Sequence, residues 1–166
     1  PANRMVSKLS NFLRYSLDND PMQKITLDQE ISALKLYLDI EKVRFEERLQ
    51  LEIDVEDDAR RAMIPSLLLQ PLVENAIKYG IARSNDAGHL RIAARVFAGE
   101  LLIELSDDGP GVELVEGQIP DANGVGLRNT RERLNELYGS RHSFQLGKTD
   151  PHGLTVNIRI PFETRS

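Results

Sequence analysis

Hydrophobic residues recur at helical spacing in the first third of the chain. One such segment runs from Arg4 to Leu17, where Asp18-Asn19-Asp20-Pro21 interrupts the pattern, and it predicts a first helix. A second helix is predicted from Thr26 to about Glu47. Thr26 and Gln29 begin it as a Thr-x-x-Gln capping box, in which each side chain can satisfy a backbone amide of the other residue.

Two apolar stripes run along the second predicted helix, whereas a helix on the surface of a lone domain needs only one. Either the helix is deeply buried in its own domain, or the N-terminal helices also pack on something else, such as a second subunit. The pattern favours neither alternative. The first stripe contains Leu27, Ile31, Leu34, Leu38 and Phe45, and the second contains Leu36, Ile40 and Val43.

Beyond Leu49 strands and helices follow one another in mixed order. Apolar and polar residues alternate in the predicted strands, Pro65 opens a third helix that ends at Gly80, and Gly139 closes a fourth. This order predicts an α+β fold, a two-layer α/β sandwich whose mixed sheet is covered on one face by helices and preceded by the N-terminal helices. The predicted strands are 51–55, 89–96, 101–106, 143–146 and 154–161, the last two as a hairpin, and the fourth helix is 126–138.

The composition is that of a folded domain. The 166 residues are 40% hydrophobic and 28% charged, which fits one core of ordinary size. A net charge of −5, without a run of Lys or Arg, argues against nucleic acid as a partner, and the lack of cysteine excludes disulfides and thiolate metal sites. The apolar stretches are shorter than the ~20 residues that a membrane-spanning helix needs. We therefore expect a cytoplasmic location.

The helix predicted after Pro65 has one apolar and one polar face. Asn75 is a poor helix former, but its side-chain oxygen suits a hard cation such as Mg²⁺. Lys78 lies one turn further on and can meet a phosphate, and Tyr79 offers a ring for stacking. Glu74 shares this polar face. An ordinary amphipathic surface helix would give the same division of faces.

A turn rich in Asp and Gly follows the predicted strand 101–106. Its sequence is Asp107-Asp108-Gly109-Pro110-Gly111, and its glycines let the backbone turn sharply and approach a flat ligand. The carboxylate of Asp107, at the end of the strand, can accept a hydrogen bond from an exocyclic amine such as that of adenine. Turn formation alone also explains such a segment.

Glycines precede the fourth predicted helix in the segment Gly124-Val125-Gly126-Leu127. Free amides at a helix N-terminus can hold a phosphate, and the helix dipole favours the negative charge. The polar, acidic segment 112–123 before it has the composition of a lid over a ligand, although a plain surface loop would have a similar one.

These three segments, in this order, resemble the Bergerat ATP-binding fold of the GHKL superfamily, which includes histidine kinases, gyrase-type ATPases and Hsp90. The stretch 67–80, with the sequence LLLQPLVENAIKYG, is similar to the N box of the LytS-type sensor histidine kinases. The stretches 13–17, 37–49 and 129–139 also resemble that group. The resemblance covers nearly the whole chain and implies ATP and Mg²⁺ as ligands.

The resemblance also implies a role for each site residue. Gyrase-type ATPases carry a Glu four residues before the metal-binding Asn, where this chain has Pro71, so a simple ATP hydrolase is disfavoured. Glu74 remains a candidate base. The implied roles are Asn75 as Mg²⁺ ligand, Lys78 as phosphate contact, Tyr79 in the adenine wall, Asp107 as adenine reader, Gly109 and Gly111 around the pocket, and Gly124, Gly126 and Leu127 near the phosphates.

The phosphorylated histidine of the LytS-type family lies in a Pro-His-Phe motif upstream of the region that Arg4 to Leu17 resembles. This chain lacks the motif, and its histidines, His89, His142 and His152, are expected at the surface. It also begins at Pro1 without a methionine, as a fragment would. The resemblance implies that residues 1–20 end a dimerisation and phosphotransfer helix, 21–48 form a connecting helix and 49–166 form the catalytic domain.

The predicted function is therefore transfer of the ATP γ-phosphate to a histidine upstream of this fragment, which cannot autophosphorylate alone. The resemblance further implies onward transfer to an aspartate of a response regulator of the LytTR kind, and a membrane-anchored, homodimeric full-length protein. A non-catalytic module for nucleotide binding or dimerisation is an alternative. A serine kinase of the anti-sigma type is another, but the two N-terminal helices do not suit it.

Overall fold

A five-stranded mixed sheet forms the centre of the molecule, in a computed structural model that describes residues 23–45, 49–77, 88–108, 125–148 and 153–164. The strand order is β2-β4-β5-β7-β6. β2 and β4 are parallel, and the other neighbours are antiparallel. The strands are β2 (Leu49–Val55), β4 (Gly88–Phe97), β5 (Glu100–Asp107), β6 (Ser143–Lys148) and β7 (Leu154–Pro161).

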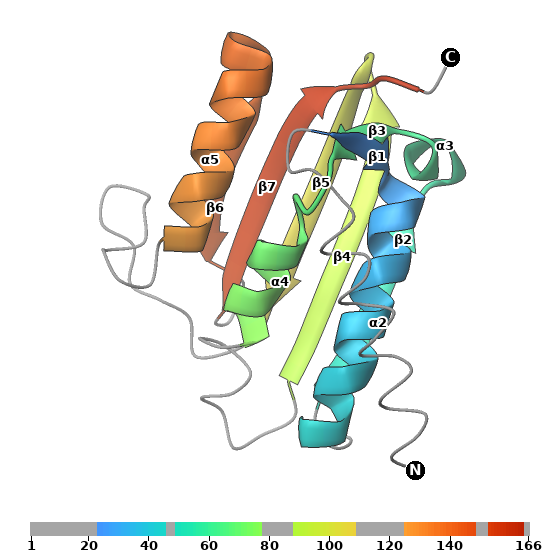
Figure 1. Ribbon diagram of the computed structural model, residues 1–166, viewed down its shortest axis with the longest axis vertical. Helices are drawn as coiled ribbons and strands as arrows, with labels where there is room; N and C mark the ends of the chain where they lie inside the picture. Colours follow the sequence, from blue (N-terminus) through green and yellow to red (C-terminus); the bar gives the residue numbers. More distant parts are fainter. Residues whose placement is uncertain (1–22, 46–48, 78–87, 109–124, 149–152, 165–166) are drawn as a thin grey trace.

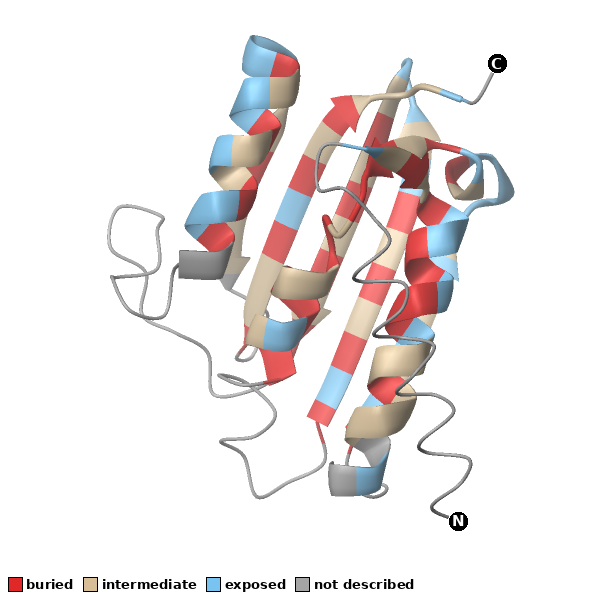
Figure 2. Cartoon of the chain, in the orientation of Figure 1, coloured by how far each residue is buried: buried red, intermediate tan, exposed pale blue. Residues whose placement is uncertain are grey.

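Three helices cover one face of this sheet, as Figure 1 shows. They are α2 (Leu27–Phe45), α4 (Gln70–Asn75) and α5 (Val125–Tyr138). Every second residue of the central strands points toward these helices and is buried, so that buried and less buried positions alternate along β5 and β7 (Figure 2). The predicted two-layer α+β sandwich is confirmed. Its core combines Leu27, Ile31, Leu34 and Leu38 of α2 with Leu72, Val73, Leu127 and Leu134 of the other helices and Leu90, Ile92, Leu101, Ile103, Val156, Ile158 and Ile160 of the strands.

The other face of the sheet is polar and carries a hollow of about 860 Å³ lined by residues of all five strands. Arg91 lies among three carboxylates of neighbouring strands, with nitrogen–oxygen distances of 2.6 Å to Glu52, 3.0 Å to Asp54 and 3.6 Å to Glu104. These groups are substantially exposed to solvent. Exposed ion pairs stabilise a fold little, so this face is a solvated surface in which opposite charges are paired.

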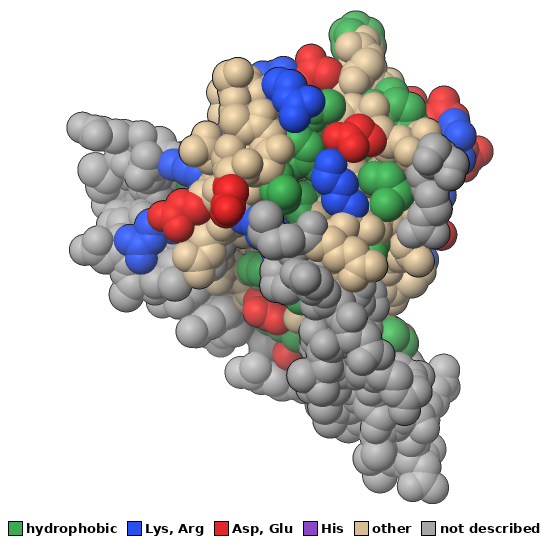
Figure 3. All heavy atoms as spheres, turned by 45° about the horizontal axis from the view of Figure 1, so that its top comes forward, with side chains coloured by type: hydrophobic (Ala, Val, Ile, Leu, Met, Phe, Trp, Pro, Cys, Tyr) green, Lys and Arg blue, Asp and Glu red, His purple; other side chains and the backbone are tan. Residues whose placement is uncertain are grey.

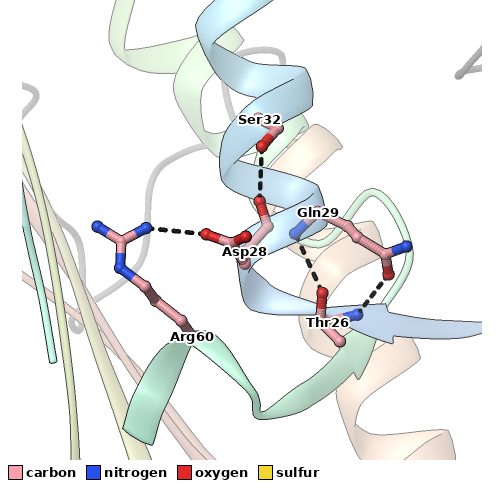
Figure 4. Close-up of polar contacts among 5 residues, drawn as sticks. All are labelled: Thr26, Asp28, Gln29, Ser32 and Arg60. Atoms are coloured by element: carbon pink, nitrogen blue, oxygen red, sulfur yellow. Dashed lines mark hydrogen bonds and ion pairs between the residues drawn. The ribbon is translucent and has the colours of Figure 1, made fainter. Parts of the chain in front are cut away.

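Helix α2 begins at the capping box that the sequence predicts, shown in Figure 4. The Thr26 amide donates to Oε1 of Gln29 at 3.0 Å, and the Gln29 amide donates to Oγ1 of Thr26 at 3.1 Å. Nearby, Ser32 donates to the Asp28 carbonyl at 3.0 Å, and Arg60 donates to the Asp28 carboxylate at 2.9 Å. The predicted start of the helix is confirmed.

The two apolar stripes of α2 have different environments. Leu27, Ile31, Leu34 and Leu38 are at most 1% exposed and belong to the core. Leu36 and Ile40 are half-buried, and Val43 is 60% exposed. One stripe therefore faces the domain, and the other is not covered by the part of the chain that the structure describes. The helix predicted from Arg4 to Leu17 lies outside that part.

The predicted start of the third helix at Pro65 is wrong. Pro65 ends β3 (Met63–Pro65), which pairs antiparallel with β1 (Lys24–Thr26). Leu67 then adopts a left-handed conformation with φ of 59°, which no helix continues. α4 begins only at Gln70, with Pro71 in its first turn, where a missing amide hydrogen costs nothing.

Most other predicted elements are confirmed within a residue or two. The strands and the final hairpin are present, and α5 ends before Gly139, whose φ of 56° is the left-handed conformation typical of a helix end. The short helix α3 (Asp57–Arg60) and the β1–β3 pair were not predicted. No helix among the described residues is long and apolar enough to cross a membrane.

Candidate functional site

Four elements from distant parts of the chain meet at one end of the sheet. In Figure 1 the last turn of α4, the end of β5 and the start of β7 lie in the lower half of the molecule, and α5 begins at about mid-height. α4 also packs against α5. Asn75 ends α4, Asp107 ends β5, and Gly126 lies in the first turn of α5. Of the elements that carry the described members of the three predicted segments, α4 and α5 are in contact.

Helix α4 has the two predicted faces. Leu72 and Val73 are at most 2% exposed, whereas Glu74 is exposed and receives a hydrogen bond from the Gln70 side chain at 3.1 Å. Asn75 is half-buried, and its Nδ2 is buried without a hydrogen-bond partner among the described residues. A buried donor without an acceptor costs about 1–3 kcal/mol, so a ligand that supplies an acceptor here is favoured.

Asp107 ends β5 on the side of the sheet that the helices cover, and it is 5% exposed. The side chains on the same face of β5 at every second position before it are those of Leu101, Ile103 and Leu105, which are core residues. A carboxylate that replaces an apolar side chain in this row is costly to desolvate, which is typical of a residue with a specific partner or ligand.

Gly153, just before β7, supports the Asp107 turn and was missed in the sequence analysis. A Cβ at this position would lie 1.9 Å from the carbonyl oxygen of Asp107 and 3.0 Å from Cα of Asp108, and its φ of 125° is rarely adopted by residues with a side chain. Only glycine lets the chain enter β7 so close to the end of β5. The sequence contains one indication of this role: Gly153 directly precedes a segment in which apolar and polar residues alternate.

Asp108 joins the end of β5 to the start of β4. Its carboxylate accepts the His89 amide hydrogen at 2.7 Å and lies 2.6 Å from the His89 ring at Nδ1, while its own amide donates to the His89 carbonyl at 3.2 Å. Three contacts between two residues fix the residue that follows Asp107. His89 itself is exposed and His142 is half-buried, and His152 lies outside the described residues.

The start of α5 is a candidate position for an anion because of its backbone amides. The first four amides of a helix lack partners within the helix, and the first turn of α5 contains no acidic residue that would repel an anion. Leu127 is 4% exposed and faces the core, so only its backbone is available to a ligand. Of the predicted site residues, Lys78, Tyr79, Gly109, Gly111 and Gly124 lie outside the described residues.

Comparison with known proteins identifies two sequence families. A profile of the family described as "Histidine kinase" matches residues 1–49, and a profile of the family described as "Histidine kinase-, DNA gyrase B-, and HSP90-like ATPase" matches residues 61–164. The second match spans most of the described sheet and all three site segments.

Several curated relatives are sensor histidine kinases. Sensor histidine kinase YesM of Bacillus subtilis is 33% identical over 161 residues, covering 96% of this chain and 27% of YesM. Sensor histidine kinase/phosphatase LytS of Staphylococcus aureus is 31% identical over 171 residues, covering 98% of this chain and 29% of LytS. The chain thus spans less than a third of the length of these relatives.

Solved structures show the same fold at lower identity. The catalytic domain of histidine kinase ThkA has a TM-score of 0.63 at 13% identity, covering 86% of this chain and 98% of that domain. Histidine kinase ThkA in complex with response regulator protein TrrA also gives 0.63, at 15% identity, covering 97% of this chain and 49% of that chain. The chain therefore belongs to the family of histidine kinase-, DNA gyrase B- and HSP90-like ATPases, and it is similar to sensor histidine kinases such as YesM and LytS.

Proposed function

We propose that this chain binds ATP at the end of the sheet where α4, β5 and α5 meet, and serves as the catalytic part of a sensor histidine kinase. The observation that carries the proposal is the buried side-chain amide of Asn75, which has no hydrogen-bond partner among the described residues. The buried carboxylate of Asp107 and the first turn of α5, whose backbone amides have no partner within the helix, support it. Each has a different preferred contact on a nucleotide.

Because these groups contact different parts of the nucleotide, together they fix its orientation. Asp107 accepts a hydrogen bond from the exocyclic amine of adenine, and the positive end of α5 faces the phosphates through Gly126 and Leu127. Lys78 adds a positive charge at the phosphates, and Tyr79 with Gly109 and Gly111 lines the adenine end. Gly124 gives the phosphates access to the backbone.

The residues at the phosphate end fit Mg²⁺, with Asn75 as its protein ligand. Magnesium bound to a nucleotide keeps water and phosphate oxygens and needs only one or two oxygens from the protein. Accordingly, the described residues include no cluster of three His, Cys, Asp or Glu side chains, and none is required. Asn75 would offer its side-chain oxygen to the ion, and a bound phosphate would offer an acceptor to its buried Nδ2. The ion would neutralise charge on the phosphates.

The protein contributes positioning more than covalent chemistry. In transfer of a phosphoryl group to histidine, the bond between phosphorus and the imidazole nitrogen forms while the bond to the leaving oxygen of ADP breaks. Asp107 and α5 hold the two ends of ATP, so that its γ-phosphate points out of the site toward an incoming imidazole. Glu74 is exposed beside Asn75 and is placed to take up a proton from the reacting histidine.

The remaining parts of the proposal concern the full-length protein. The acceptor histidine lies upstream, in the dimerisation region that residues 1–20 end and that residues 21–48 connect to the catalytic domain at 49–166. The phosphoryl group then passes to an aspartate of a response regulator, of the LytTR kind by resemblance. The solved complex of ThkA with its response regulator TrrA supports such a partner. We also propose membrane anchoring of the full-length protein, a homodimer, and a cytoplasmic location for this domain.

A labelling experiment tests the kinase step. The chain is extended upstream to include the histidine region, and γ-labelled ATP is added with Mg²⁺. We expect an acid-labile phosphate on the extended protein, none on this chain alone, and none on the extended Asn75→Ala variant. Absence of label on the extended protein, with ATP still bound, would contradict a kinase and favour the non-catalytic module.

A further inference from the structure

Glu30 is a charged residue in the middle of the apolar core. It lies on α2 between Leu27 and Ile31 and is 0% exposed. Burying a carboxylate is costly unless its oxygens are satisfied, so its contacts must compensate for lost hydration. They lie on the segment that leads into α4, more than thirty residues further along the chain.

Both oxygens of Glu30 bind backbone amides of that segment. The Leu67 amide donates to Oε1 at 3.2 Å, and the Leu69 amide donates to Oε2 at 2.8 Å. Leu67 has the left-handed φ of 59° that a leucine rarely adopts, and Leu69 is the residue directly before α4. The carboxylate therefore binds the backbone on both sides of Leu68. These two hydrogen bonds fix the residue at which α4 begins.

Arg133 of α5 interacts electrostatically with this carboxylate. Burial lowers the pKa of its guanidinium, and the negative charge of Glu30 opposes that change. Arg133 is half-buried, and its Nε is buried without a hydrogen-bond partner among the described residues. Glu30 thus interacts with the elements that carry two of the three site segments, the start of α4 and the body of α5.

We propose that Glu30 is a positioning residue for the nucleotide site: from α2 it sets the position of α4, and with it Asn75, relative to α5. The inference rests on the proposed function, because Asn75 is the residue being positioned. α2 is also the element that joins the catalytic domain to the upstream region. A shift of α2 would consequently move the metal-binding end of the site and leave Asp107, on β5, in place.

The test compares two affinities of the Glu30→Gln variant: that for Mg-ATP, which has phosphates and a metal ion, and that for adenosine, which has neither. Glutamine has the shape of glutamate but only one oxygen to offer, so it can accept only one of the two amides. We expect calorimetry to show Mg-ATP affinity reduced about tenfold, as for other residues that hold a metal ligand in place. Adenosine, tested by competition, should bind Glu30→Gln and wild type equally, because Asp107 reads the adenine.

Asp28→Asn is the matched control. Asp28 is another carboxylate in the first turn of α2 with a side-chain contact to a distant segment, but its partner Arg60 is on α3 and the pair is exposed. The control should keep both affinities. Equal losses of Mg-ATP and adenosine binding in Glu30→Gln, or no loss of either, would overturn the inference while the proposed function stands. Lack of Mg-ATP binding by wild type would overturn the proposed function and this inference with it.

A measurement on the wild-type chain covers the case in which Glu30→Gln does not fold. Because coupling between two sites is reciprocal, bound Mg-ATP must strengthen the contacts that favour its binding. Hydrogen exchange of the Leu67 and Leu69 amides should therefore slow when Mg-ATP saturates the protein, and should not slow with adenosine. Unchanged exchange at both amides with Mg-ATP, or equal slowing by both ligands, would overturn the positioning role.

Discussion

The upper end of the sheet in Figure 1, where β5 begins and β7 ends, is held by polar side chains that contact one another. Lys24 Nζ lies 3.1 Å from both carboxylate oxygens of Glu163 and 5.0 Å from the centre of the Tyr138 ring. Arg159 pairs with Glu100. Acidic and basic side chains are interspersed over this end, as Figure 3 shows.

The lower end is built differently. Asn75 has a buried side-chain amide without a hydrogen-bond partner among the described residues, Asp107 occupies a position in an apolar row, and the first turn of α5 contains no acidic residue. Lys24, Glu163, Arg159 and Glu100 at the upper end are paired, whereas Asn75 at the lower end has a buried donor that a ligand would satisfy. A functional site commonly departs from local stability rules in this way. Substitutions at the two ends should therefore have opposite effects on stability and binding.

The largest effect is expected at Gly153, which joins the site to the sheet. In Gly153→Ala the new Cβ would overlap the Asp107 carbonyl, so we expect the free energy of unfolding to fall by about 3 kcal/mol or more in chemical denaturation. Gly147→Ala is the control, because no atom lies within 4 Å of its added Cβ. Equal stability of the two variants would contradict the close approach of β7 to Asp107.

Tyr138 allows a test of the upper end by pH. Burial, aided by the nearby Glu163, raises the pKa of Tyr138 from 10.0 to about 12. The unfolded chain then loses this proton first, so its contribution is intact below pH 10 and about 2 kcal/mol of stability is lost as the pH rises to 12. In Tyr138→Phe this alkaline loss should be smaller by that amount.

The same variant should not be destabilised at pH 7. The Tyr138 hydroxyl is buried without a hydrogen-bond partner among the described residues, so its removal leaves no group unsatisfied. Denaturation curves of wild type and Tyr138→Phe at pH 7 and at pH 11 to 12 separate the two effects. An unchanged difference between the proteins across this range would contradict a raised pKa.

Asn75→Ala should separate stability from binding at the lower end. Alanine is the better helix former and has no buried donor, so we expect the free energy of unfolding to stay equal or rise by about 1 kcal/mol. Mg-ATP affinity should fall about tenfold. Asn135→Ala, at an exposed position of α5, is the control for helix propensity and should keep the affinity. A loss of stability in Asn75→Ala would place this residue with the structural groups instead.

The smallest effect is expected at the cap of α2. Thr26→Ala removes the hydroxyl that accepts the Gln29 amide, which should cost about 1 kcal/mol in chemical denaturation and leave Mg-ATP binding unchanged. Ser32→Ala, whose exposed hydroxyl donates within the helix, should cost less. Reduced Mg-ATP affinity in Thr26→Ala at full folding would contradict a purely stabilising cap.

Local patterns could be predicted from the sequence, and contacts between distant segments could not. The Thr26–Gln29 cap and the alternation in β5 depend on neighbours in the chain, and both predictions are confirmed. Pro65 was predicted to open a helix because nothing nearby shows that its strand pairs with Lys24–Thr26. The left-handed Leu67 is likewise held by Glu30, far away in sequence.

The same distinction between local patterns and contacts of distant segments applies to the candidate site. Asn75 and Asp107 were found from the order of three segments, and the fold places the ends of their elements together. Gly153 was missed because the atoms that exclude a side chain at this position belong to Asp107, on the neighbouring strand. Lys78, Tyr79, Gly109, Gly111 and Gly124 stay predictions.

Calorimetric titration of Mg-ATP against wild type and Asp107→Asn tests the central claim most directly. Asparagine is similar in size but lacks the charge and one of the two acceptor oxygens, so the adenine amine meets a weaker, neutral acceptor. We predict measurable binding to wild type and an affinity at least about tenfold lower for Asp107→Asn, with both proteins folded. Undiminished affinity in Asp107→Asn, or no binding by wild type, would contradict a nucleotide site at this end of the sheet.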